Sequence, residues 1–245
     1  MIRYMSIFLA CFIMNTFATG TDGWMLHSNW GFNHAFDSVL SVHTTDKDIV
    51  HQATWDGKSF IDSPYYTIRI DHWSGDKVSG WEWVHYKMYL DNNPSDIQSF
   101  SISDGYNMLF YNIGHRSKTN WIRKVGAGII MAHPDVTLLN RERFWNKGGL
   151  SGAYLAGVAV QTSLETWVHQ TDRHVFSIEG KLSAGYARIP ISKNTAEFAD
   201  VPHIAFHLTF GMGSKPLKNT SASSLAWYMA PPLIHHYAIY KFKDL

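Results

Sequence analysis

Cysteine, unbalanced charge and long hydrophobic runs are all scarce in this sequence of 245 residues. Cys11 is the only cysteine, so an exported chain that has lost its leader has no disulfide to stabilise it. Lysine and arginine number 21 against 20 aspartates and glutamates, and this balance gives no electrostatic reason to expect a nucleic-acid partner. No run of about 18 apolar residues follows the N-terminal leader, which excludes a helical membrane protein.

Residues 1–20 have the composition of a secretory signal peptide. A long apolar stretch follows Arg3, and the small residues Ala18 and Gly20 precede the expected cleavage site. An alternative is a lipoprotein signal acylated at Cys11, because the residues before it loosely resemble a lipobox. We expect cleavage after Gly20 and export to the bacterial outer membrane.

Alternation of apolar and polar residues predicts the fold. From His203 to Gly213, large apolar side chains alternate with small or polar ones, which is typical of a strand with one apolar face. A strand of roughly 9 to 11 residues crosses a membrane obliquely. We therefore predict an all-β fold, an antiparallel up-and-down transmembrane β-barrel of eight strands. The predicted strands lie near Phe36–Thr44, Tyr65–Trp73, Trp81–Leu90, Phe100–Asn112, Trp121–Ala132, Gly152–Ser163, His174–Arg188 and His203–Gly213.

The connections between these strands alternate in length. With the N-terminus in the periplasm, the long connections lie outside and the short turns inside, as in outer-membrane barrels. Only Asp91–Ser99, an outer connection by this count, is short. The long ones are Thr45–Pro64, Pro134–Ser151 and Ile189–Pro202, and the short ones are Ser74–Gly80, Ile113–Asn120 and Leu164–Arg173.

The chain thus divides into a signal peptide (1–20), a barrel (21–213) and a C-terminal segment (214–245). Apolar residues alternate again from Ile234 to Phe242, so the last segment is either a closing strand or an appendage. If it closes the barrel, ten strands become the main alternative, because bacterial barrels have an even number.

Four phrases of the sequence resemble a family of Gram-negative outer-membrane β-barrel proteins that is uncharacterised. They are WEWVHYKMYLDNNP, VGAGIIMAHPDV, EGKLSAGYARIP and ADVPHIAFHLTFGMG, and the resemblance covers about residues 65 to 213. It implies a barrel in the outer membrane and no particular activity.

The polar faces of the predicted strands are expected to line the lumen. An eight-stranded barrel has room inside only for side chains, and charges there need partners. We interpret them as a structural ion-pair network that closes the lumen, with a ligand or catalytic site as the alternative. In the third predicted strand, Trp83 is expected on this lumen face and Val84 on the lipid face. The lumen residues are Arg69, Asp71, His85, Lys87, Glu179, Lys181, His203 and His207.

Neither a metal nor another cofactor is predicted. His203 and His207 lie about 13 Å apart along an extended strand and cannot bind one ion by themselves. A sharper enzymatic hypothesis rests on His115 and Ser117, whose spacing of two resembles the His-x-Ser pair of outer-membrane lipid A deacylases. In that hypothesis Ser117 is the nucleophile and His115 the base, although the predicted topology places them in a periplasmic turn.

The leading functional hypothesis is an integral outer-membrane protein with a structural or surface-interaction role, monomeric and in contact with outer-membrane lipid and lipopolysaccharide. One alternative is a lipid A acyl hydrolase on the same barrel. Another is a soluble periplasmic barrel with an apolar ligand inside, because alternation alone does not distinguish the inner face from the outer. A pore is disfavoured because the predicted lumen is crowded.

Overall fold

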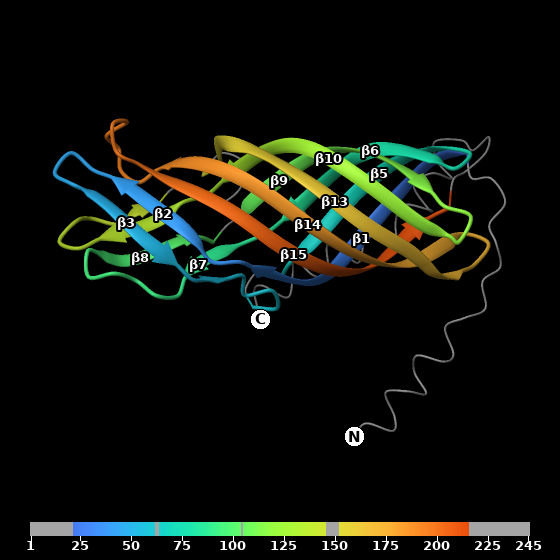
Figure 1. Ribbon diagram of the computed structural model, residues 1–245, viewed down its shortest axis with the longest axis horizontal. Helices are drawn as coiled ribbons and strands as arrows, with labels where there is room; N and C mark the ends of the chain where they lie inside the picture. Colours follow the sequence, from blue (N-terminus) through green and yellow to red (C-terminus); the bar gives the residue numbers. More distant parts are fainter. Residues whose placement is uncertain (1–21, 62–63, 104, 146–151, 216–245) are drawn as a thin grey trace, which may run out of the picture.

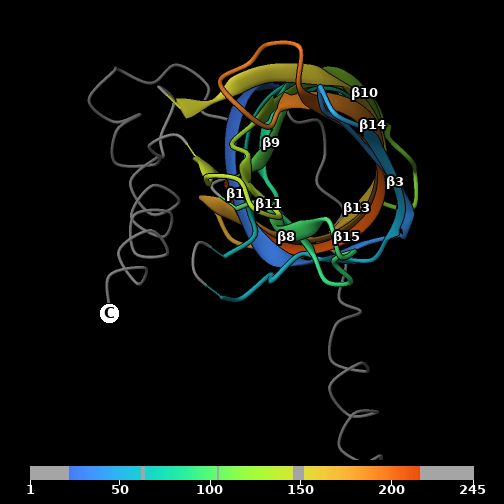
Figure 2. The same cartoon turned by 90° about the vertical axis from the view of Figure 1, so that its left-hand side faces the viewer.

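The computed structural model describes residues 22–61, 64–103, 105–145 and 152–215, and these form a closed antiparallel barrel of eight strands (Figure 1). Each strand pairs with the next, and β15 pairs with β1 from His27 to Ala35, which closes the ring (Figure 2). The predicted all-β, eight-stranded architecture is confirmed. The barrel strands are β1 (Gly23–Ala35), β5 (Tyr66–Ser74), β6 (Lys77–His85), β9 (Tyr106–Arg116), β10 (Trp121–Ala132), β13 (Tyr154–Gln170), β14 (His174–Pro190) and β15 (Phe198–Ser214).

The described residues contain no helix that is long and apolar enough to span a membrane. The C-terminal segment, which was predicted to be a closing strand or an appendage, lies outside the described residues from residue 216 onward.

The first barrel strand was predicted wrongly. The segment Phe36–Thr44 corresponds to β2 (Ser38–His43), which forms a hairpin with β3 (Asp48–Ala53) beyond the barrel wall. The true first strand, β1, escaped notice because Met25 and Leu26 are both buried near its start and its inner face is mixed in polarity.

Two further predicted strands each join two real ones. The prediction Trp81–Leu90 spans β6 and β7 (Met88–Leu90), and Phe100–Asn112 spans the end of β8 (Ile97–Ile102) and the start of β9. Apolar and polar residues keep alternating in the sequence across both gaps between strands, because the strands on either side of each gap also have one buried face. The connection from β6 to β9 is therefore long, and Asp91–Ser99 is only a part of it.

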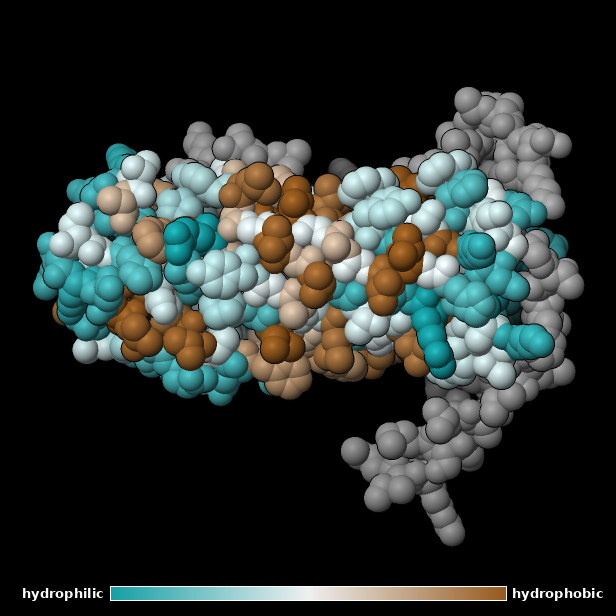
Figure 3. Space-filling model, turned by 45° about the horizontal axis from the view of Figure 1, so that its top comes forward, coloured by the Kyte–Doolittle hydropathy of each residue, from teal (hydrophilic) through white to brown (hydrophobic). Residues whose placement is uncertain are grey.

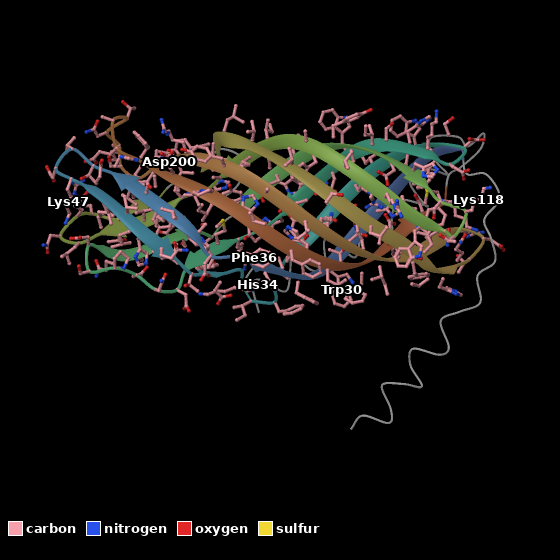
Figure 4. The ribbon with its side chains drawn as sticks, viewed as in Figure 1. Trp30, His34, Phe36, Lys47, Lys118 and Asp200 are labelled. Carbon is pink, nitrogen blue, oxygen red and sulfur yellow. The ribbon has the colours of Figure 1, made fainter. Side chains whose placement is uncertain are left out.

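The long connections build a second, five-stranded sheet at one end of the barrel (Figure 1). Lys47 and Asp200 lie at this end, and Lys118, in the short turn between β9 and β10, lies at the other (Figure 4). We call these the outer end and the turn end. The sheet has the order β12-β11-β8-β7-β4, with the further strands β4 (Trp55–Asp56), β11 (Asp135–Leu138) and β12 (Phe144–Trp145).

The barrel is apolar outside. Its interior holds buried charges in the middle and a buried apolar cluster toward the outer end, to which Val84, Met108, Phe110 and Ile130 belong. Phe206 is 36% exposed, whereas its neighbour His207 is fully buried, and hydrophobic side chains gather around the middle of the surface (Figure 3). The alternative of a soluble barrel with an apolar ligand inside requires charged side chains such as Arg69 and Glu179 to face water, whereas both are buried. Other large apolar side chains exposed on the barrel strands are Trp30, Phe32, Val125, Ile129, Val158, Val160, Leu164, Leu182, Ile204 and Phe210.

Candidate functional site

Arg69 is the centre of an ion-pair network in the middle of the lumen. Its guanidinium, on β5, is 1% exposed and donates to three carboxylates. Nε lies 2.6 Å from Asp71 Oδ2, Nη2 lies 2.7 Å from Glu165 on β13, and Nη1 lies 3.0 Å from Glu179 on β14. Such charge-assisted bonds use the fixed fork of an arginine, so Arg69 ties opposite parts of the wall together.

Two lysines complete the network. Lys124 on β10 pairs with Glu165 and with Glu179, whose Oε1 lies 2.9 Å from its Nζ. Lys181 on β14 pairs with Glu82 on β6 and lies 3.5 Å from Glu179. All five side chains are at most 3% exposed, so each charge depends on its partners rather than on water.

Amides extend the network at Glu82. Its Oε2 accepts hydrogen bonds from Asn112 Nδ2 at 3.0 Å and from Gln161 Nε2 at 2.7 Å. At the other side, His27 Nε2 lies 3.7 Å from Asp71 Oδ2. Side chains of β1, β5, β6, β9, β10, β13 and β14 thus meet across the middle of the lumen.

The turn end of the lumen is closed by an arginine between two tryptophans. The guanidinium carbon of Arg116 lies 4.4 Å from the ring centre of Trp73 and 3.9 Å from that of Trp167. The two indole rings meet edge to face at 5.6 Å, and Trp167 Nε1 donates to Glu165 Oε1 at 3.2 Å. A cation on aromatic faces in a buried place is a strong contact, so we call this group the aromatic plug.

Toward the outer end, Ser183 lies between two histidines. Its Oγ is 2.8 Å from His207 Nε2 and 3.3 Å from His203 Nε2, and His203 Nδ1 is 3.0 Å from the Tyr106 hydroxyl. That hydroxyl donates to the carbonyl of Val201. His203 must therefore donate from Nδ1 and accept from Ser183 at Nε2, and His207 must donate from Nε2, so the bonds form one directional chain.

The residues predicted for the lumen fall into three groups. Arg69, Asp71, Glu179 and Lys181 join the network, and His203 and His207 join the Ser183 chain. Both histidines reach one hydroxyl because Ser183 pairs with Ala205, midway between them. No group of three or more metal-ligating side chains occurs in the part of the chain that the structure describes.

His85 and Lys87 lie apart from both groups. His85 Nδ1 is 2.8 Å from Asn107 Oδ1 and its ring stacks on Tyr66, and Lys87 Nζ donates to the carbonyl of Ile61 at 2.5 Å.

The predicted phase of the strand around these residues is wrong. Glu82 and Val84 face the interior, whereas Trp81 is 54% exposed. The inner face of β6 carries mostly small and apolar residues, so polarity alone did not identify it.

Sequence reasoning missed Glu82, Lys124, Glu165 and the aromatic plug. Lys124 lies on a predicted strand, in the inward phase of the alternation. Glu165 and Trp167 lie in the segment Leu164–Arg173, which was wrongly predicted as a turn, because β13 continues to Gln170. An assignment of the inner faces of the predicted strands would have found Lys124 but not Glu165.

His115 and Ser117, proposed as an acyl-hydrolase pair, lie at the turn end. His115 is exposed on the last turn-side residues of β9. Ser117 Oγ is 2.9 Å from Thr119 Oγ1 and accepts from the Trp121 amide at 3.1 Å, which are the bonds of a tight turn. Their catalytic role stays a prediction.

Outside the barrel, Glu197 joins three connections at the outer end. Its Oε1 accepts from the Thr45 amide at 3.1 Å and from Arg141 Nη1 at 2.8 Å, and Arg141 also pairs with Asp46. Burial raises the pKa of the Glu197 carboxyl, but hydrogen bonds from Arg141, Ser192 and Thr45 outweigh it and lower that pKa to about 2. The outer connections are thus linked by a carboxylate that stays charged.

Two solved outer-membrane proteins share similarity with this chain. One is the crystal structure of the outer membrane protein OprG from Pseudomonas aeruginosa, with 13% identity and a TM-score of 0.46 over 80% of this chain and 97% of that chain. The other is the solid-state NMR structure of the outer membrane protein AlkL in DMPC lipid bilayers, with 12% identity and a TM-score of 0.45 over 84% and 96%. No protein-family model matches the sequence. No curated protein matches it either, so the resemblance to an uncharacterised barrel family stays a prediction.

Proposed function

We propose that this protein is a sealed outer-membrane barrel that carries an interaction surface at its outer end. The observation that supports this most is an exposed apolar wall around a lumen that contains an ion-pair network. In a membrane the apolar wall meets lipid, and a lumen filled by paired charges leaves no water path.

Strand lengths support a barrel that projects from the membrane on one side. β13, β14 and β15 have 17 residues each, more than the roughly 9 to 11 that a membrane requires. At the outer end, Phe198–Asp200 of β15 pair with β2 of the outer hairpin. In this proposal the turn end is periplasmic, the chain is exported by its signal peptide, and the barrel is a monomer surrounded by outer-membrane lipid and lipopolysaccharide.

The outer end has the features of a contact surface. Glu197 and Arg141 hold its connections together, and apolar side chains remain exposed there, among them Val50 at 70%, Leu139 at 51% and Trp145 at 45%. In this proposal these exposed apolar groups are contact points for another molecule.

Reconstitution tests the proposal. The mature chain should enter vesicles, migrate differently on gels before and after heating, and give no steady conductance in a planar bilayer. A chain that stays soluble without detergent contradicts the membrane location, and a stable ohmic conductance contradicts the sealed lumen.

A further inference from the structure

A groove of about 460 Å³ crosses the outer wall of β10, β13, β14 and β15. It opens on the apolar surface of the barrel rather than into the lumen. Its lining on the outer face consists of Arg123, Thr162, Leu164, Gly180, Leu182 and Phe206, and the inward residues Ser163 and Lys181 complete it from the wall.

The groove exists because one outward position has no side chain. Leu164 pairs with Gly180, and Gly180 pairs with Leu208, so the glycine lies in a row of large apolar residues. A Cβ added at Gly180 would meet only the far end of the Phe206 ring, at 4.0 Å. The space above this glycine is therefore open and can take a larger group.

Arg123 places a positive charge at one end of the groove. It pairs with Leu164 and lies two residues from Trp121, where β10 begins at the turn end. Its side chain is exposed, and among the described residues no ion pair engages it. From Arg123 the groove passes over Gly180 to Phe206, which lies in the middle of β15.

A cation near the membrane surface, followed by an apolar groove toward the membrane centre, matches the layout of a phospholipid. We propose that the groove holds one phospholipid of the leaflet at the turn end, with its phosphate on Arg123 and one acyl chain over Gly180. This inference rests on the proposed membrane orientation. Anionic phospholipid should bind best, because its headgroup has no cation of its own to offset the attraction of its phosphate to Arg123.

Native mass spectrometry of the full mature barrel, released from vesicles of phosphatidylcholine with phosphatidylglycerol, tests this assignment. The wild type should retain one phosphatidylglycerol. Gly180→Leu fills the groove and should abolish retention, whereas Ala127→Leu, an outward small-to-large change on β10 outside the groove, should not. Arg123→Gln should reduce the preference for phosphatidylglycerol roughly fivefold, whereas Lys118→Gln in the neighbouring turn should leave it unchanged.

Retention that survives Gly180→Leu, or that is lost equally in Ala127→Leu, overturns the assignment. Dimers in place of bound lipid would show that a second copy covers the groove. A barrel that inserts into vesicles and retains no lipid contradicts only the lipid site. A chain that does not insert contradicts the proposed function as well.

Discussion

Lys181 and Glu82 form an ion pair across the lumen, from β14 to β6, and neither side chain is exposed. Three barrel strands lie between them along the wall on the β9 side. The pair therefore acts as a strut that joins distant parts of the ring, in a place where water cannot replace either partner.

Removal of one partner should cost more than removal of both. Glu82→Gln or Lys181→Met leaves a buried charge unpaired and should lower the free energy of unfolding by about 3–5 kcal/mol. The double variant should recover part of this loss. Urea unfolding in vesicles measures the free energies of the wild type, the two single variants and the double variant. The exposed pair of Arg143 and Asp135 is the control, and Arg143→Gln should change little because water screens that pair. Additive losses in the double variant would show that the two charges are not coupled.

Arg116 should stabilise the turn end through both tryptophan faces. Arg116→Ala should lower the free energy of unfolding by about 2 kcal/mol and make Trp73 and Trp167 accessible to water. Acrylamide quenching of tryptophan emission measures that access. Arg116→Lys keeps the charge, so its stability and its quenching should lie between those of the wild type and those of Arg116→Ala. Unchanged quenching in Arg116→Ala would mean that the aromatic plug does not depend on the cation.

The hydrogen bonds around Ser183 also predict the tautomers of two histidines. His203 should carry its proton on Nδ1 and His207 on Nε2, as the chain through Ser183 requires. Nitrogen chemical shifts of the histidine rings measure this, with the exposed His34 as a reference. Ser183→Ala removes the shared hydroxyl and should cost about 1–3 kcal/mol of stability. A proton on Nε2 of His203 would contradict the order of bonds.

Much of the wall could be predicted from alternation. β5, β10, β13, β14 and β15 were located because their outer faces are mostly apolar. β1 and β6 were not assigned correctly, since their inner faces hold enough apolar or small residues to hide the period of two.

The sequence could predict on which face of a strand a site residue lies, but not its height along the barrel. Alternation indicates which residues point inward, as for Arg69 and Glu179. It does not tell at what height along the barrel each side chain lies, because height depends on strand tilt and register. The meeting of Arg116 with Trp73 and Trp167, from three separate strands, was therefore beyond sequence reasoning.

Acid should loosen the outer connections at Glu197. Its pKa is about 2 in the folded protein against an ordinary value of 4.5. A lowered carboxyl pKa contributes stability that is complete above pH 4.5 and is lost as the pH falls through about 2. Pepsin cleavage near Thr45 should rise over this range, and Glu197→Gln should be cleaved readily throughout. A cleavage rate in the wild type that does not change with pH would contradict this role.

Cysteine labelling in membranes measures the direction of side chains most directly. The mature chain predicted here has no cysteine, since Cys11 lies in the leader, so each introduced thiol reports alone. Phe206→Cys should react with a membrane-soluble maleimide and resist a charged one, whereas His207→Cys should resist both. Ready reaction of His207→Cys with the charged reagent would contradict a filled lumen, and reaction of Phe206→Cys with it would contradict a wall that faces lipid.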